Sequence, residues 1–187
     1  GCTFARRAVE YGVQGFDHCT IFMRHFFRNA IIWVLTKEAT LLLRRTRPFV
    51  IAITGSVGKT SMKDMIALLL GGESGDPYVR KSAKSFNSEI GIPLTVLGLT
   101  NAWSSPVGWL SNILVGAFRA FFSADQPRTL VLEVGADHPG DIRRAAAWLH
   151  PHIAVVTRLP DTPVHVEYFP NPEAVRQEKA ELVRALD

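Results

Sequence analysis

The sequence predicts an α/β fold, in which a P-loop-containing, mostly parallel sheet is flanked by helices and preceded by an N-terminal helical appendage. Two observations predict this class. From residue 49 onward, short apolar runs alternate with helical segments, and a glycine-punctuated turn joins the first apolar run to a helix. A length of 187 residues with 47% hydrophobic content is sufficient for one core and excludes a disordered chain.

Residues 1–48 form the predicted appendage and differ from the rest of the chain in charge. They carry eight Lys or Arg residues against three Asp or Glu residues, whereas residues 49–187 carry thirteen against fourteen. The basic excess is confined to the N-terminal quarter, which argues against nucleic acid as a partner of the main domain. We expect the main domain, residues 49–187, to be incomplete at its carboxyl end, because the sequence stops directly after a predicted helix.

The apolar part of the appendage, residues 20–48, has two interpretations. Its uncharged stretch Asn29–Thr36 is far shorter than the ~20 residues that span a bilayer, and no signal-peptide cleavage site follows it. The segment either packs on the main domain or on a missing partner, or it contacts a membrane surface. Cys2 and Cys19 form neither a disulfide framework nor a zinc pattern. We therefore expect a cytoplasmic protein, with association at the inner face of the membrane as the second interpretation.

The main domain is predicted to begin with a strand over residues 49–54 (FVIAIT), because this short apolar run follows Pro48. A glycine turn and a helix over residues 60–70 come next, and the segment GGESGD ends that helix. The remaining predicted elements are a short strand over 78–80, a helix over 107–122, strands over 129–134 (TLVLEV) and 153–157 (IAVVT), and helices over 141–149 and 172–186. Because strands and helices alternate, we expect the strands to run parallel.

The strongest local signal is ITGSVGKTS, residues 53–61, in which a predicted strand enters a glycine turn and then a helix. Gly55 and Gly58 allow backbone N–H groups to face phosphate oxygens without a Cβ in the way, and the helix N-terminus favours an anion. Lys59 can reach the β- and γ-phosphates of a nucleoside triphosphate, and the Thr60 hydroxyl can ligate Mg²⁺. The expected nucleotide-binding residues of this loop are Gly55, Ser56, Val57, Gly58, Lys59, Thr60 and Ser61.

This short G-x-x-G-K-T loop resembles that of the Mur ligase superfamily, the ATP-dependent ligases of peptidoglycan precursor synthesis and the related folylpolyglutamate synthases. A second segment, Phe86–Leu97 (FNSEIGIPLTVL), resembles the Asn-containing I-G-x-P segment of the MurF-type branch, which adds D-alanyl-D-alanine. The resemblance implies that Asn87 lies near the γ-phosphate, where its amide can donate to a developing anion. Judged without the resemblance, an Asn-Ser pair is equally suited to capping an element.

A third segment, Leu130–Asp141 (LVLEVGADHPGD), is similar to the family's E-x-G segment. Glu133 comes at the carboxyl end of a predicted buried strand, where open parallel sheets bind their ligands. A carboxylate at that place can hold Mg²⁺ directly or through water. We interpret Asp137 and Asp141 mainly as turn and cap residues.

The fourth segment, Pro151–Leu186, contains the last predicted strand. After that strand it resembles the family's H-x-E-x-F and K-x-E-[IL] motifs at the family's spacing. The resemblance implies that His165 binds a second metal ion and that Lys179 is carbamylated by CO₂, whereas Glu167 matches the pattern without an assigned role. Carbamylation needs a neutral amine, so Lys179 must be desolvated or close to other cations. Judged alone, a lysine flanked by Glu178 and Glu181 would be a solvated helix face.

Together these segments imply an ATP-dependent carboxylate–amine ligase that forms an amide through an acyl phosphate. A UDP-muramoyl peptide and a dipeptide are the expected substrates. The implied catalytic residues are Lys59, Asn87, His165 and Lys179, and the implied ligands of two Mg²⁺ ions are Thr60, Glu133, His165 and Lys179. Two alternatives remain: a non-catalytic, membrane-proximal ATP-binding module, and a folylpolyglutamate synthase-like ligase. Catalysis is favoured over binding alone, because nucleotide binding needs only the glycine loop, whereas Glu133, His165 and Lys179 are all present as well.

Overall fold

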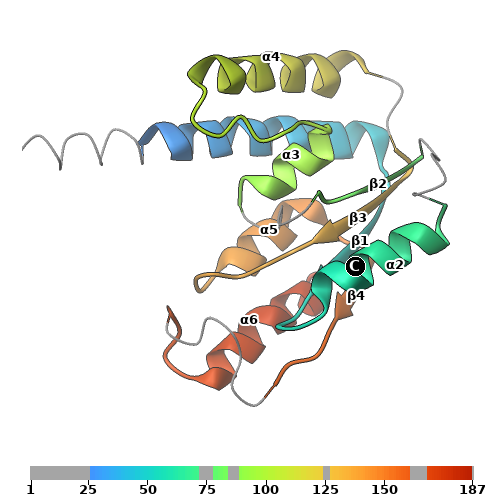
Figure 1. Ribbon diagram of the computed structural model, residues 1–187, viewed down its shortest axis with the longest axis vertical. Coiled ribbons are helices and arrows are strands. Elements are labelled where there is room, and N and C mark those ends of the chain that lie inside the picture. Colours follow the sequence, from blue (N-terminus) through green and yellow to red (C-terminus); the bar gives the residue numbers. More distant parts are fainter. Residues whose placement is uncertain (1–25, 72–77, 84–88, 124–126, 161–167, 187) are drawn as a thin grey trace, which may run out of the picture.

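The computed structural model describes residues 26–71, 78–83, 89–123, 127–160 and 168–186. At the centre is a four-stranded parallel sheet in the order β2-β3-β1-β4 (Figure 1). The strands are β1 (Phe49–Thr54), β2 (Val79–Lys81), β3 (Thr129–Glu133) and β4 (Ile153–Val156). The predicted class, a parallel α/β sheet flanked by helices, is therefore confirmed.

Alternation along the two central strands gives the sheet two apolar faces, because successive side chains point to opposite sides. Ile51, Ile53 and Val131 pack with Ala67 of α2 (Lys59–Leu69) on one face. The opposite face packs on α3 (Gly91–Leu97), α5 (Asp141–Leu149), α6 (Pro172–Arg184) and a helix over residues 26–46. The helices that follow β1 and β3 therefore leave the sheet toward different faces, which opens a crevice at the carboxyl edge of the strands.

The helix over residues 26–46 packs on the main domain through its apolar side. Leu35, Ala39 and Leu42 are at most 2% exposed and belong to the same core cluster as β1, α3 and α5. Within the described part of the chain, no helix is long and apolar enough to cross a bilayer.

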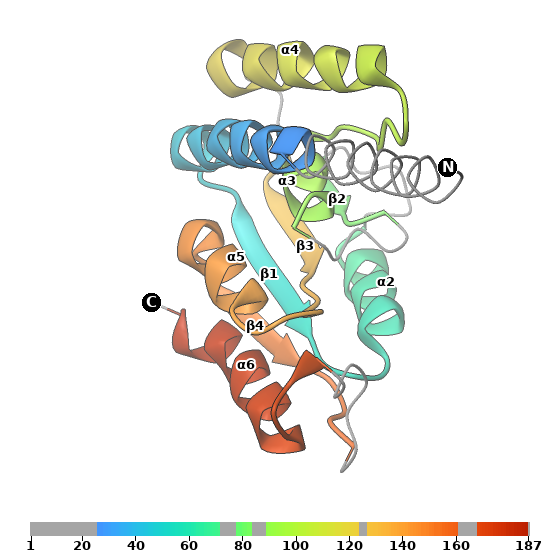
Figure 2. The ribbon, with the colours of Figure 1, turned by 90° about the vertical axis from the view of Figure 1, so that its left-hand side faces the viewer.

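The long helix α4 (Pro106–Phe122) lies outside this layer, beside the helix over residues 26–46 (Figures 1 and 2). The Ser105 side chain caps it by accepting from the Gly108 N–H at 3.1 Å, and Pro106 occupies its first turn. The buried residues of α4 are Asn112, Gly116 and Ala120, and Gly116 lets the two helices approach closely.

Most element boundaries agree with the sequence-based predictions to within two residues. The strand over 49–54 and the helix over 141–149 occur as predicted. The helix α3 (Gly91–Leu97) is the element that the sequence analysis did not predict, because Gly91 and Pro93 disfavour a helix interior. All seven of its residues are buried, so packing rather than propensity determines this helix.

A partly buried carboxylate, that of Glu38, lies between α4 and the N-terminal helix. A Cβ added to Gly116 would overlap Glu38 Oε2, and this oxygen has no hydrogen-bond partner among the described residues. Burial raises the pKa of the Glu38 carboxyl from 4.5 to about 7. The folded state therefore holds this proton more tightly than the unfolded state does.

We predict that this carboxyl makes the free energy of unfolding depend on pH. Its contribution is fully present below the unfolded pKa of 4.5 and declines as the pH rises through the folded pKa of about 7. Glu38→Gln, which keeps the shape and removes the charge, should flatten this decline and make the variant more stable than wild type at about pH 8. Urea unfolding at a series of pH values measures it, and Glu173→Gln, at an exposed position of α6, is the control. Parallel pH profiles for wild type and Glu38→Gln would contradict the prediction.

Candidate active site

The predicted phosphate loop connects β1 to α2 at the carboxyl edge of the sheet. Gly55 has a φ of 140°, and a Cβ there would overlap the Thr157 hydroxyl, so only glycine allows this close approach. Gly58 is the N-cap of α2 with a φ of 87°, and no side chain caps the helix. The amides of Ser56 and Val57 donate to the Arg158 carbonyl at 3.2 and 3.4 Å. The uncapped first turn of α2 is therefore the part of this loop suited to an anion.

A hydroxyl and a carboxylate meet at the first turn of α2. Thr60 Oγ1 donates to Glu133 Oε2 at 2.9 Å. Glu133 ends β3, where it pairs in register with Ile53, and it is 3% exposed. Its backbone N–H donates to Ser82 Oγ at 3.1 Å. Thr60 and Glu133, which the sequence analysis assigned to one metal, are thus brought together, and the positioning residue Ser82 carried no sequence signal of its own.

Two lysines converge on one carbonyl oxygen. Lys59 Nζ donates to Gly55 O at 3.0 Å, and Lys179 Nζ donates to the same oxygen at 3.2 Å from the other side of the chain. Lys179 is 4% exposed, so it is not part of a solvated helix face. Burial first, and the Lys59 cation second, lower the pKa of Lys179 from 10.5 to about 8. An anion placed between the two ammonium groups would relieve their repulsion.

Lys179 is positioned by the acid that precedes it. Glu178 accepts from the backbone N–H groups of Gly140 and Ile142, both at 2.8 Å, and so caps the N-terminus of α5. This fixes α6 against α5 and turns the next residue, Lys179, toward the glycine loop. The sequence analysis missed this role, because the cap comes from a residue 36 positions away from Ile142 in the chain.

The remaining residues singled out in the sequence are a predicted cap residue and two predicted site residues. Asp141 Oδ2 accepts from the N–H groups of Asp137 and His138 at 2.9 and 2.7 Å, as expected of a turn and cap residue. Asn87 and His165 lie outside the described residues. Within the described ranges, no cluster of three His, Cys, Asp or Glu side chains could hold a metal ion.

Two hydroxyls at the loop are buried and lack partners in the described part of the chain. These are Thr54 Oγ1, at the end of β1, and Ser56 Oγ in the loop itself. A buried hydroxyl without a partner is costly, and a bound polar group would satisfy it. Together with the uncapped helix and the paired lysines, they make the loop suited to a phosphorylated ligand.

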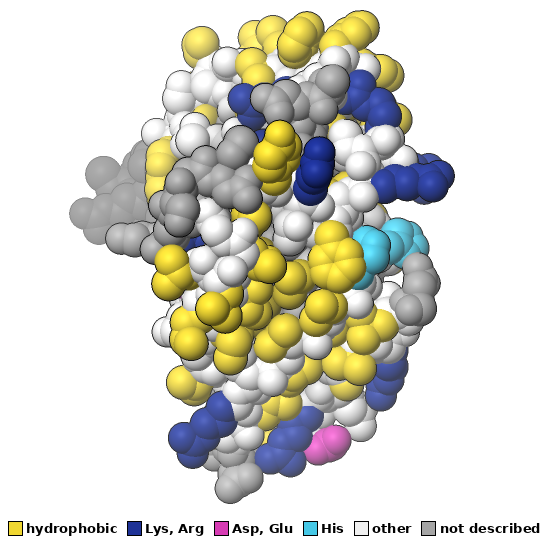
Figure 3. Space-filling model, turned by 90° about the vertical axis from the view of Figure 1, so that its right-hand side faces the viewer, with side chains coloured by type: hydrophobic (Ala, Val, Ile, Leu, Met, Phe, Trp, Pro, Cys, Tyr) yellow, Lys and Arg dark blue, Asp and Glu magenta, His cyan; other side chains and the backbone are white. Residues whose placement is uncertain are grey.

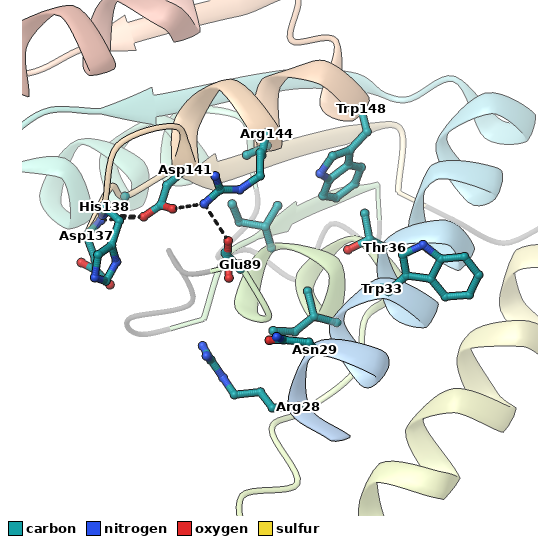
Figure 4. Close-up of a pocket in the computed structure, with 14 residues that line it drawn as sticks. Arg28, Asn29, Trp33, Thr36, Glu89, Asp137, His138, Asp141, Arg144 and Trp148 are labelled. Carbon is teal, nitrogen blue, oxygen red and sulfur yellow. Dashed lines mark hydrogen bonds and ion pairs between the residues drawn. The ribbon is translucent and has the colours of Figure 1, made fainter. Parts of the chain in front are cut away.

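A cavity of about 610 Å³ opens beside this edge of the sheet, between α5 and the helix over residues 26–46 (Figure 4). Trp33 and Trp148 contribute aromatic walls, and Arg28 lies on the wall opposite α5. Figure 4 shows Arg144 held between Asp141 and Glu89, and its distance to Glu89 Oε1 is 3.0 Å. The cavity reaches Gly135 in the turn that follows β3, so it approaches the carboxyl end of that strand, where Glu133 lies.

Comparisons with known proteins agree with this geometry. The chain is 30% identical over 153 residues to the UDP-N-acetylmuramoyl-tripeptide–D-alanyl-D-alanine ligase of Haemophilus influenzae, and 36% identical over 139 residues to that of Mycobacterium leprae. These matches cover 81% and 73% of this chain, but only 28% and 21% of the relatives. The chain thus spans less than a third of the length of these relatives.

Solved structures show the same fold. The MurF ligase of Thermotoga maritima in complex with ADP matches with a TM-score of 0.61 at 26% identity, over 83% of this chain and 30% of that one. A MurF structure from Acinetobacter baumannii matches with a TM-score of 0.60 at 22% identity, over 86% and 28% of the two chains. Residues 53–187 match the Mur ligase middle domain. The chain therefore belongs to the Mur ligase family, through its middle domain.

Proposed function

We propose that this chain is the ATP-binding part of an ATP-dependent carboxylate–amine ligase of peptidoglycan precursor synthesis. The observation that carries the proposal is the convergence of Lys59 and Lys179 on the Gly55 carbonyl, beside the Thr60–Glu133 pair. A phosphate-binding module alone requires the loop and Lys59, but it does not require a second buried lysine with a lowered pKa. The expected substrates are ATP, a UDP-muramoyl tripeptide and D-alanyl-D-alanine, the last two after the names of the relatives.

The donor set at Thr60 and Glu133 fits a magnesium ion. Both offer hard oxygen atoms, and they lie within hydrogen-bond distance of each other on two elements fixed by the sheet. A bound Mg²⁺ would neutralise charge on the phosphates of ATP. The resemblance assigns a second Mg²⁺ to His165 and carbamylated Lys179.

The proposed reaction has two steps. The uncapped turn of α2 and Lys59 hold the phosphates, and the substrate carboxylate, entering through the cavity beside α5, attacks the γ-phosphorus. The bond to the β-phosphate oxygen breaks, which gives an acyl phosphate and ADP. The amine then attacks the acyl carbon, inorganic phosphate leaves, and the amine loses a proton as the amide forms. Asn87, by its resemblance, donates to the γ-phosphate.

Carbamylation of Lys179 would turn the repulsive pair of lysines into an attractive one. The neutral amine adds to CO₂ and releases a proton, so the cation becomes a carbamate anion with two oxygen atoms. The buried position and the nearby Lys59 favour the neutral amine that this step needs. The product would accept from Lys59 and offer oxygen ligands to a metal.

The N-terminal appendage, residues 1–48, is proposed to place this domain at a membrane surface in the cytoplasm. Its described part, residues 26–48, carries five Lys or Arg residues and one Glu. Basic segments of this kind are attracted to anionic lipids.

Loss of Lys59 tests nucleotide binding. Lys59→Ala should weaken ATP binding by about 10- to 100-fold, since it removes a charge-assisted hydrogen bond to phosphate, and should lower ATP turnover to background. Isothermal titration with ATP and Mg²⁺ measures the affinity, with Lys37→Ala on the N-terminal helix as the matched control. Unchanged affinity in Lys59→Ala would refute the phosphate site.

Replacing one carboxylate oxygen tests the metal site. Glu133→Gln can still accept from Thr60 but loses the negative charge, so we expect the Mg²⁺ concentration for half-maximal ATP binding to rise by about tenfold or more. A Mg²⁺ titration of ATP binding measures this, and Glu173→Gln should leave the titration unchanged. A normal Mg²⁺ requirement in Glu133→Gln would remove Glu133 from the metal site.

The carbamate has a direct spectroscopic test. With ¹³C-bicarbonate, the chain should show a carbamate carbon resonance that increases as the pH rises through about 8, because the neutral form of Lys179 increases there. Lys179→Ala should lose this resonance and, in the active ligase, lose turnover that formate or acetate partly restores. Persistence of the resonance in Lys179→Ala would refute a carbamate at Lys179. Its loss in Lys37→Ala would place the carbamate on Lys37 instead.

A further inference from the structure

The helix α4 turns its large apolar side chains outward. They recur at helical spacing along one side and are between 58% and 77% exposed. This α4 outer face consists of Val107, Leu110, Leu114, Phe118, Phe121 and Phe122. The inward side carries Asn112, Gly116 and Ala120, with Trp109 and Ile113 partly buried against the core, so α4 presents apolar side chains on its outer side as well as toward the core. In Figure 3, hydrophobic side chains line the upper edge of the molecule, where α4 lies.

The surrounding contacts hold this face outward. Asn112 Nδ2 donates to the Thr100 carbonyl at 2.9 Å, and Arg119 donates to the carbonyls of Leu97 and Gly98, both at 2.6 Å. Arg45, from the N-terminal helix, donates to backbone carbonyls at the carboxyl end of α4. Rotation of α4 would break these bonds and replace the small inward residues with large ones. A contiguous exposed apolar patch is typical of an interaction surface.

The charge around the α4 outer face is positive. The helix over residues 26–46, the two residues after it and α4 together carry six Lys or Arg residues and one acid, Glu38, whose carboxylate is turned toward Gly116. A cavity of about 470 Å³ near the carboxyl end of α4 is lined by Arg45, Arg47 and Arg128, and its described lining contains no acid. Guanidinium groups suit phosphate. Figure 3 shows Lys and Arg side chains just below the apolar edge.

The arrangement of the helices suits a flat surface. In both Figure 1 and Figure 2, α4 is the outermost element at one end of the molecule and lies parallel to the layer beneath it. The 17 residues of α4 give it a length of about 25 Å. The loop between β1 and α2 lies toward the other end of the molecule, so a surface against α4 leaves the candidate active site open.

We propose that the α4 outer face docks on an anionic phospholipid bilayer, with its apolar side chains in the boundary between headgroups and acyl chains and with Arg47 and Arg128 of the adjacent cavity on lipid phosphates. An interfacial helix has this combination of an apolar face and a basic flank. The proposal rests on the proposed membrane contact of the appendage and deepens it, since it assigns the penetrating surface to α4. It is independent of the proposed ligase chemistry.

Vesicle flotation tests the proposal on the full chain. Wild type should float with phosphatidylcholine vesicles that contain about 30% phosphatidylglycerol, should bind neutral phosphatidylcholine vesicles at least about tenfold more weakly, and should be released by salt. The triple variant Leu114→Gln, Phe118→Gln, Phe121→Gln should lose about 100-fold in partitioning. The matched control, Met65→Gln, Leu68→Gln, Leu69→Gln, removes exposed apolar side chains from α2 and should bind as wild type does.

The basic cavity has its own variant. Arg47→Ala, Arg128→Ala should reduce the preference for anionic over neutral vesicles while leaving the apolar face intact. Far-UV circular dichroism checks that each variant is folded. A folded α4 triple variant that floats like wild type would overturn the proposal and assign membrane binding to the appendage alone. An apolar face that instead holds two copies together would also overturn it, and would appear as a dimer without vesicle binding that the triple variant dissociates.

A second measurement needs no variant of α4. Trp103, 80% exposed, lies in the turn before Pro106, the first residue of α4. Brominated acyl chains should quench its fluorescence in wild type bound to vesicles, and Trp103→Phe should remove most of that quenching. Equal quenching with and without Trp103 would contradict insertion at α4.

Discussion

The carbonyl of Gly55 is the point on which the candidate active site depends. Its position is fixed because Gly55 passes so close to Thr157 at the end of β4 that a side chain would not fit. Lys59 reaches it from the same loop, and Lys179 reaches it from a helix 124 residues further along the chain. Two cations on one neutral acceptor repel each other, and, after burial, this repulsion is the second cause of the lowered pKa of Lys179. In the proposed ligase, a phosphate oxygen or a carbamate would supply the compensating negative charge.

The sheet and two carboxylates produce that convergence. The pairing of β1 with β3 brings Glu133 beside the end of the loop, where the first turn of α2 supplies Thr60. Glu178 positions a second residue of the site on the other face of the sheet. It caps α5 and so sets the direction of Lys179. One acid thus serves as a ligand candidate, and the other as a positioning residue. A buried carboxylate is stable in both places because backbone or hydroxyl donors satisfy it.

The far end of the molecule follows a different constraint. There α4 approaches the N-terminal helix through Gly116, and this approach partly buries the Glu38 carboxyl, whose pKa rises to about 7. This close approach leaves the large side chains of α4 in solvent, beside arginines that have few acids near them. The molecule therefore separates the polar edge that carries the glycine loop from an apolar, basic end, and a single α/β domain presents both at once.

The sequence by itself determined the fold class, most strand and helix positions and the glycine loop, because these depend on local periodicity and on turn residues that are neighbours in the chain. It also indicated Thr60, Glu133 and Lys179, through their spacing and a family resemblance. Only the tertiary structure decided that Lys179 is buried beside Lys59, that Glu178 caps another helix and that α3 is helical despite Gly91 and Pro93. The outward direction of the α4 apolar face belongs to the same group. Each of these depends on which distant segments pack together, and periodicity within one segment carries no information about its neighbours in space.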